Sequence, residues 1–127
     1  MLKANKIYYA HHLWKYNTSI EEYELNLIKR YFPYHEIINP NGHIKQNREE
    51  SIIMKDCLTC IEDCGILIFS SVNGVVGRGV YDEFKKASKL GLPIYYIMDD
   101  ILYDARSYDF KLMKSENNRL YAIVLTK

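Results

Sequence analysis

The fold of this chain is decided by residues 66–84, which read ILIFSSVNGVVGRGVYDEF. The apolar run at the start is typical of a buried strand, and the acidic end is typical of the first turns of a helix. Gly74, Gly77 and Gly79 lie between them and allow the backbone to approach a ligand closely. The unpaired N–H groups of a helix start favour an anion. This segment predicts a small-molecule site that holds a phosphate or a sugar beside an acidic side chain.

The composition is that of one globular domain. The chain has 127 residues, of which 48% are apolar and 26% charged, and its formal net charge is +1. So small a charge, without a dense basic block, argues against a nucleic-acid polymer as partner. No apolar run reaches the length of a membrane span, the first residues lack a signal-peptide core, and three cysteines are too few for a disulfide framework. We expect residues 1–127 to form a single cytoplasmic domain that binds neither nucleic acid nor membrane.

Apolar runs and helical spacings alternate along the chain. Strands are expected at residues 6–10, 34–38, 64–69, 93–98 and 119–126. Helices are expected from Thr18 or Ser19 to Pro33, from Glu49 to about Asp63, and from Val80 to Leu90 with Gly91 as the C-cap. Residues 101–118 are predicted as a loop or a short helix. The alternation implies right-handed βαβ crossovers, and therefore an α/β fold with a mainly parallel sheet covered on both faces.

In such folds, ligands bind outside the carboxyl ends of the strands. The loops at that end contain the candidate substrate-binding residues His11, His12, Asn39, Ser70, Ser71, Gly77, Arg78 and Gly79. The two histidines can act as acid or base, contact a phosphate, or belong to a plain loop. Arg78 can contact a phosphate or face solvent.

Helical geometry separates two acids of the third helix. Val80, Phe84 and Ala87 form its buried stripe. At about 100° per residue, Glu83 lies about 60° from the start of that stripe and Asp82 points nearly opposite. Glu83 is therefore expected to face the crevice, whereas Asp82 is expected to be solvated. The alternative is that Glu83 only complements the helix dipole.

The second helix offers an acid and three cysteines. Asp56 lies at an angle to its apolar stripe similar to that of Glu83. The spacing of Cys57, Cys60 and Cys64 includes a CxxC pair, which makes zinc an alternative. Zinc would need a fourth ligand and outward-facing thiols, whereas these thiols lie on the apolar stripe. We therefore expect buried cysteines and no metal.

Several segments, taken in order, resemble the nucleoside 2-deoxyribosyltransferase family, which includes nucleoside 5′-monophosphate N-glycosidases. They are residues 6–10 (KIYYA), 38–40 (INP), 55–56 (KD), 63–68 (DCGILI), 79–83 (GVYDE) and 90–94 (LGLPI). The resemblance covers residues 6–97 and rests on the ordered set. It implies a flavodoxin-like three-layer sandwich with a five-stranded, mainly parallel sheet, whose strand order is 2-1-3-4-5. It also implies assembly as a homodimer or a higher homo-oligomer.

The resemblance further implies a catalytic set. Glu83 matches the glutamate that attacks the anomeric carbon of the sugar, and Tyr8 matches the tyrosine that orients this carboxylate. Asp56 matches an aspartate near the base, where it could supply a proton. The implied activity is that of an N-glycosidase or a 2-deoxyribosyltransferase, which cleaves the N-glycosidic bond of a nucleotide or nucleoside without a cofactor.

The chain also departs from the family pattern. His11 to Trp14 stand where Gly-Pro or Gly-Ser loops are common, and the usual aspartates before the catalytic turn are missing. Ser70, Ser71 and Arg78 occur there instead and favour a phosphorylated substrate. An alternative of another class is a sensor that binds a nucleotide or an NAD derivative in the same pocket without turnover, with Glu83 gripping ribose hydroxyls.

Overall fold

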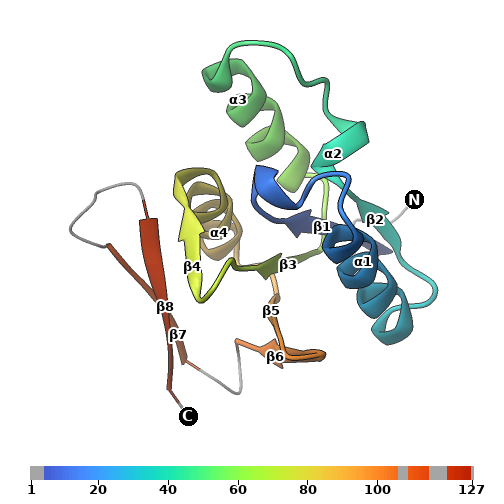
Figure 1. Ribbon diagram of the computed structural model, residues 1–127. Helices are drawn as coiled ribbons and strands as arrows, with labels where there is room; N and C mark the ends of the chain where they lie inside the picture. The colour runs from blue at the N-terminus through green and yellow to red at the C-terminus, as the bar shows by residue number, and fades with distance from the viewer. Residues whose placement is uncertain (1–4, 106–108, 115–119, 127) are drawn as a thin grey trace.

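A computed structural model describes residues 5–105, 109–114 and 120–126 and shows a mixed α/β fold (Figure 1). The main sheet has five strands in the order β2-β1-β3-β5-β6. They are β1 (Lys6–Ala10), β2 (Glu36–Ile38), β3 (Ile66–Ser70), β5 (Ile94–Met98) and β6 (Ile101–Asp104). Every pairing is parallel except that of β5 with β6. The predicted α/β class with a mainly parallel five-stranded sheet is confirmed.

Clear capping chemistry marks the start of α1 and the end of α4. They are η2 (Leu13–Lys15), a short 3-10 helix, and α1 (Ser19–Tyr31), α2 (Pro40–His43), α3 (Glu50–Ile61) and α4 (Arg78–Leu90). Thr18 caps α1, because its Oγ1 accepts a hydrogen bond from the backbone N–H of Glu21. Gly91 ends α4 in the left-handed conformation, with φ 74°. In the described ranges, no helix is both long and apolar enough to cross a membrane.

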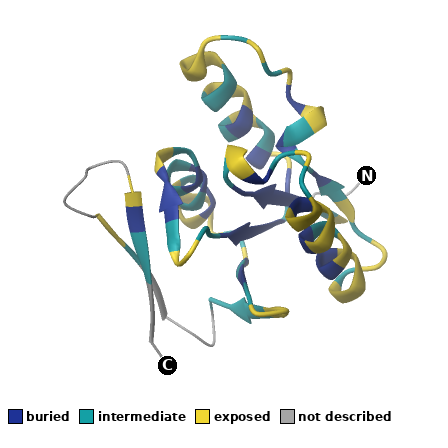
Figure 2. Cartoon of the chain, in the orientation of Figure 1, coloured by how far each residue is buried: buried dark blue, intermediate teal, exposed yellow. Residues whose placement is uncertain are grey.

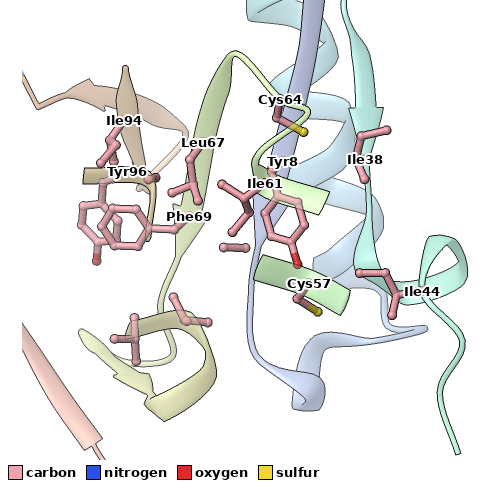
Figure 3. Packing of buried hydrophobic residues seen from close by; sticks show 14 of the residues in the cluster. Tyr8, Ile38, Ile44, Cys57, Ile61, Cys64, Leu67, Phe69, Ile94 and Tyr96 are labelled. Carbon is pink, nitrogen blue, oxygen red and sulfur yellow. The ribbon is translucent and has the colours of Figure 1, made fainter. Parts of the chain in front are cut away.

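The alternation of side chains along the strands sorts the core into two clusters. The central strands β1 and β3 are buried along nearly their whole length (Figure 2). The cluster on the α1 side includes Ile7, Tyr9, Leu27, Ile28, Ile66 and Ile68. The cluster on the α3 and α4 side includes Tyr8, Ala10, Cys57, Ile61, Leu67, Phe69, Val80 and Ala87 (Figure 3). Successive residues of β1 therefore point toward different helices, and Tyr8 points toward α3 and α4.

The fifth strand of the main sheet is β6, and not the strand predicted at residues 119–126. Asp99 and Asp100 have positive φ values of 50° and 68° and connect β5 to β6 as a two-residue hairpin turn. Positive φ at both central residues gives the turn whose twist suits an antiparallel pair. β6 therefore occupies the sheet edge. The predicted strand order holds for its first four strands and is wrong for the fifth.

The last strand lies in a second sheet of order β4-β8-β7. This antiparallel sheet consists of β4 (Val75–Gly77), β7 (Asp109–Lys114) and β8 (Leu120–Thr126). It lies beside α4 (Figure 1). There the ring of Tyr121 stacks on the ring of Tyr81, with centroids 3.7 Å apart. The loop or helix predicted over residues 101–118 is thus largely strand. Residues 106–108, 115–118 and Arg119 lie outside the described part of the chain.

The glycine-rich segment forms a hairpin and not one open loop. Asn73 and Gly74 have φ values of 53° and 79°, and Val72 and Val75 exchange backbone hydrogen bonds across them. An Asn-Gly pair between β-type residues is a strong hairpin signal. Gly74 therefore serves this turn and does not border the cavity described below.

Candidate functional site

Glu83 lies in the second turn of α4 and is buried, with 5% of its surface exposed. The hydroxyl of Tyr8, in the middle of β1, donates a hydrogen bond to its Oε2. Burial raises the pKa of Glu83 to about 8, against the opposing effect of hydrogen bonds with Tyr8 and Cys57. The carboxyl of the free protein is therefore mostly protonated at neutral pH.

The Tyr8 hydroxyl and the Cys57 thiol are both hydrogen-bonded to Glu83, and both stay protonated near neutral pH. Burial, followed by the charge of Glu83, raises the pKa of the Tyr8 hydroxyl far above its ordinary value. The same two causes raise the pKa of the Cys57 thiol to about 12. Both groups can therefore donate to Glu83 whenever it ionises. The structure brings together two members of the implied catalytic set, Tyr8 and Glu83.

A cavity of about 400 Å³ borders Glu83. Its volume is in the range of small-molecule sites. The predicted residues His11, His12, Gly77, Arg78 and Gly79 line it together with Glu83. The loop after β1 and the start of α4 thus meet at the carboxyl end of the parallel strands, as the fold class led us to expect.

His12 is fixed at the edge of this cavity. Its Nδ1 accepts a hydrogen bond of 3.0 Å from the backbone N–H of Trp14 and so caps η2. Gly77 lies against the ring, because a Cβ at Gly77 would be 3.2 Å from His12 Cδ2. Burial, followed by the charge of Lys15, lowers the pKa of His12. The imidazole is therefore neutral at pH 7.

His11 has a structural role in addition to its place in the cavity wall. Its Nε2 lies 2.7 Å from Glu21 Oε2, and its Nδ1 lies 3.2 Å from the carbonyl oxygen of Tyr9. The ring stacks on the Tyr9 ring at 3.8 Å. Burial lowers the pKa of His11, although the hydrogen bond with Glu21 opposes this shift. His11 thus connects the loop after β1 to α1.

The sequence left open whether Arg78 contacts a ligand or faces solvent, and in the structure its position allows both. It lines the cavity, and its side chain is 67% exposed. Its Nε donates to Asp82 Oδ1 at 3.2 Å, one helical turn further along α4. Asp82 therefore forms a surface ion pair, and Arg78 places a positive charge at the cavity mouth.

Asp56 does not join Glu83 in this cavity, contrary to the convergence expected from the sequence. Its Oδ2 pairs with Nη2 of Arg48 at 2.8 Å, and its side chain is 47% exposed. It borders a separate cavity of about 320 Å³, whose wall also includes Arg48. The physical reason is helical: Cys57 faces Glu83, and the adjacent residue points about 100° away.

Asn39 and Ser71 also lie outside the cavity wall. Asn39 Oδ1 accepts a hydrogen bond of 3.0 Å from the backbone N–H of Asn41 and so caps α2. Ser71 Oγ lies 2.8 Å from the hydroxyl of Tyr96. Both side chains are engaged by neighbouring elements and not by the Glu83 cavity.

Ser70 belongs to a buried polar cluster on the α1 side of the sheet. Its Oγ accepts from Lys15 Nζ at 2.9 Å and donates to Glu24 Oε1 at 2.8 Å. Lys15 Nζ and Glu24 Oε2 form an ion pair of 2.8 Å, and the Tyr9 hydroxyl donates to the same carboxylate. This cluster ties η2 to α1 and β3. The sequence analysis did not predict that these polar side chains are buried.

Other cavity residues were not identified from the sequence. Glu50, Met54 and Cys57 line the cavity at positions i, i+4 and i+7 of α3. This spacing is a helical stripe and could have been found by its periodicity. Gln46 and Arg48 precede α3, in a segment without periodic pattern, so only the folded chain shows their position.

Two of the three cysteines are buried in the core, and none of them is in a disulfide. Cys57 and Cys64 are buried, and the Cys64 thiol donates to the carbonyl oxygen of Cys60 at 3.5 Å. Among the residues that the structure describes, no group of three or more potential metal ligands is gathered.

Comparison of the chain with protein-family models and with curated proteins gives no match.

Proposed function

We propose that this protein cleaves the N-glycosidic bond of a nucleotide or nucleoside in the Glu83 cavity. One observation carries the proposal: a buried carboxyl group borders a cavity of about 400 Å³ and is held there by the hydroxyl of Tyr8. Buried acids with perturbed pKa values in cavities are typical of functional sites. The strand order β2-β1-β3-β5 further supports a flavodoxin-like three-layer fold of the nucleoside 2-deoxyribosyltransferase type.

The proposed reaction begins with ionised Glu83. Its carboxylate oxygen bonds to the anomeric carbon while the bond from that carbon to the base nitrogen breaks, and the electron pair leaves with the base. The base takes up a proton from solvent. Water then attacks the sugar ester, which yields the free sugar and restores the carboxylate. A second base in place of water would give transfer instead of hydrolysis.

Tyr8 acts in this scheme as a positioning residue. Its hydroxyl donates to Glu83 Oε2 from a buried strand, so it can fix the direction of the attacking oxygen. The Cys57 thiol supports the ionised form by a further hydrogen bond. Both contacts stabilise the carboxylate in a site where burial alone would keep it neutral.

The cavity mouth favours a phosphorylated substrate. Arg78 lines the cavity at the start of α4, and Arg48 lines it from the segment before α3. Arginine binds phosphate through charge-assisted hydrogen bonds. The variant Arg78→Ala should therefore weaken binding of 5′-monophosphates about tenfold or more, and that of the matching nucleosides little. If Arg78→Ala loses the same affinity for 5′-monophosphates as for nucleosides, the substrate need not carry a phosphate.

A second candidate function is supported by the protonation of Glu83. A neutral carboxyl in the cavity can grip ribose hydroxyls without attacking the sugar, as a nucleotide or NAD-derivative sensor would require. Incubation with nucleosides, 5′-monophosphates and NAD, followed by chromatography, distinguishes the two. Release of a free base supports the enzyme. Saturable binding without release, measured by calorimetry on the same panel, supports the sensor.

A further inference from the structure

We propose that His12 is a fixed hydrogen-bond donor to the departing nucleobase, through Nε2–H, and not an acid or a base. The identity of the ligand in this inference rests on the proposed function. The state of the imidazole itself follows from the structure alone.

The hydrogen bond at Nδ1 decides where the ring carries its proton. A backbone N–H can only donate, so the contact of 3.0 Å from Trp14 requires a lone pair on His12 Nδ1. The neutral ring then has its single proton on Nε2. Protonation of Nδ1 would set two donors against each other and break the cap of η2. The local structure therefore holds one tautomer and opposes the imidazolium form.

Two neighbours also restrict the ring. The Trp14 ring meets it edge-on, with centroids 4.5 Å apart. A Cβ at Gly77 would lie 3.2 Å from His12 Cδ2 and 3.5 Å from Nε2. Gly77 thus leaves just enough room for the ring edge that carries Nε2. Since His12 and Gly77 both line the Glu83 cavity, the donor belongs to its wall.

The elements that border the cavity contribute charged or titratable groups near His12. Lys15 of η2 opposes a positive ring. The other ionisable groups that line the cavity are His11, Tyr16, Arg48, Glu50, Cys57, Arg78 and Glu83. The two arginines also oppose a positive ring, whereas Glu50 favours one. Glu83 is mostly neutral at pH 7.

A neutral N–H donor suits the departure of a nucleobase. As the N-glycosidic bond breaks, negative charge develops on the base, and a fixed donor stabilises that charge without losing its own proton. The class of substrate is therefore a nucleobase with an acceptor nitrogen or carbonyl oxygen within reach of His12. The family resemblance implies that Asp56 supplies a proton to the base, but Asp56 borders the other cavity. His12 instead assists the departing base by a hydrogen bond.

Long-range ¹H–¹⁵N NMR of the full chain, without ligand, tests the tautomer from pH 5.5 to pH 8. The assignment comes from the signal that disappears in His12→Asn. We expect a protonated Nε2 and an unprotonated Nδ1 throughout this range. The opposite tautomer, or protonation with an ordinary midpoint near pH 6.5, would overturn the inference whether or not the protein cleaves any nucleotide.

His12→Asn tests the role in the reaction. Asparagine is a favoured N-cap residue, so the variant keeps the contact to the Trp14 N–H but is too short to place a donor at the position of Nε2. Base release from the best substrate should fall about 10- to 100-fold, with affinity changed much less. Gly77→Ala, which crowds the ring, should also reduce turnover. Turnover equal to wild type in His12→Asn would refute the donor role, and absence of turnover in the wild type would refute the proposed function instead.

Discussion

Glu83 is placed between two groups that keep their protons, the Tyr8 hydroxyl and the Cys57 thiol, in surroundings that disfavour its charge. Its pKa of about 8 is the balance between burial, which raises it, and these hydrogen bonds, which lower it. A nucleophilic carboxylate in this site is available only after deprotonation. The ionisation of Glu83 therefore falls close to neutral pH.

The pH dependence of base release should show this ionisation. If ionised Glu83 attacks the sugar, kcat/KM should rise about tenfold per pH unit below pH 8 and level off above it, since kcat/KM reports the free protein. Base release from a 5′-monophosphate between pH 6 and pH 9.5 measures the profile. A rate that falls as the pH passes 8 would mean that protonated Glu83 acts as an acid.

Glu83 should also make stability depend on pH. Its pKa is raised from 4.5 to about 8 in the folded chain, so the unfolded chain loses this proton first as pH rises. The folded state therefore loses up to about 1.4 kcal/mol per pH unit between these two values, and no more above pH 8. Glu83→Gln cannot ionise and should gain stability relative to wild type over this interval.

Urea denaturation of Glu83→Gln and wild type at pH 4.5, 6, 7 and 8.5 tests the predicted pH dependence of stability. Asp82→Asn is the matched control, because Asp82 is adjacent in the chain and forms only a surface ion pair. A stability difference between Glu83→Gln and wild type that does not vary with pH would contradict the assigned burial of Glu83.

At the scale of elements, two hairpin turns account for most of the difference between the expected and the observed fold. Asn73-Gly74 starts β4 and Asp99-Asp100 starts β6, each with two residues of positive φ. The Asn-Gly pair is a recognisable turn signal, and it was overlooked because the glycines suggested a phosphate loop. Asp-Asp is a weaker signal, so β6 was not evident from the sequence.

The Asn73-Gly74 turn can be tested with two glycine substitutions. Gly74 has φ 79°, so Gly74→Ala should cost roughly 1–2 kcal/mol of unfolding free energy. Gly79 lies inside α4, where an added Cβ would make an ordinary van der Waals contact with Met54 Sδ at 3.7 Å. Gly79→Ala should therefore be neutral or stabilise by about 0.5–1 kcal/mol. If the two variants lose the same unfolding free energy in denaturant titrations, the positive φ of Gly74 is not the cause of the loss.

The buried pair of Lys15 and Glu24 should determine how firmly η2 is held. Both side chains are less than 10% exposed, so Lys15→Met leaves a buried carboxylate without its cation. Such losses typically cost about 3–5 kcal/mol. Adding Glu24→Gln should recover much of the stability, because the charge is then removed as well. Thermal or urea unfolding of the single and double variants measures both effects, and a single variant as stable as wild type would show that the pair contributes nothing.

For the molecule as a whole, the sequence predicts the part of the fold that follows from periodicity. The strands at residues 6–10, 34–38, 64–69 and 93–98, and the helices that connect them, all occur with small shifts of their ends. The pairing of the last strand with β4 joins segments more than forty residues apart. No local pattern specifies such a pairing. The last strand was therefore predicted at the sheet edge that β6 occupies in the structure.

The candidate site, like the fold, could be predicted from the sequence only in part. Tyr8 and Glu83 meet because each lies on the inward face of a regular element, and such faces can be derived from spacing. Asp56 was misplaced because its direction depends on the rotation of α3. Ser70 was misplaced because it was taken as a loop residue, whereas it is the last residue of β3 and follows Ile66 and Ile68 on the α1 face. Arg48 was missed because it lies in an irregular segment. Periodicity thus indicated Glu83, the family resemblance indicated Tyr8, and the loops at the carboxyl ends of the strands indicated part of the cavity wall, whereas the part formed by α3 and the segment before it was not predicted.

The most direct test of the central claim compares Glu83→Gln with Asp82→Asn and wild type, using the nucleotide from which the wild type releases most base. Glutamine keeps the shape of the neutral carboxyl, so Glu83→Gln should bind this nucleotide within a few-fold of wild type in calorimetry. Its single-turnover base release should be at least about a thousandfold slower, as expected when a nucleophile is removed, while Asp82→Asn should stay close to wild type. Equal rates of base release in Glu83→Gln and wild type would contradict the claim that Glu83 breaks the N-glycosidic bond.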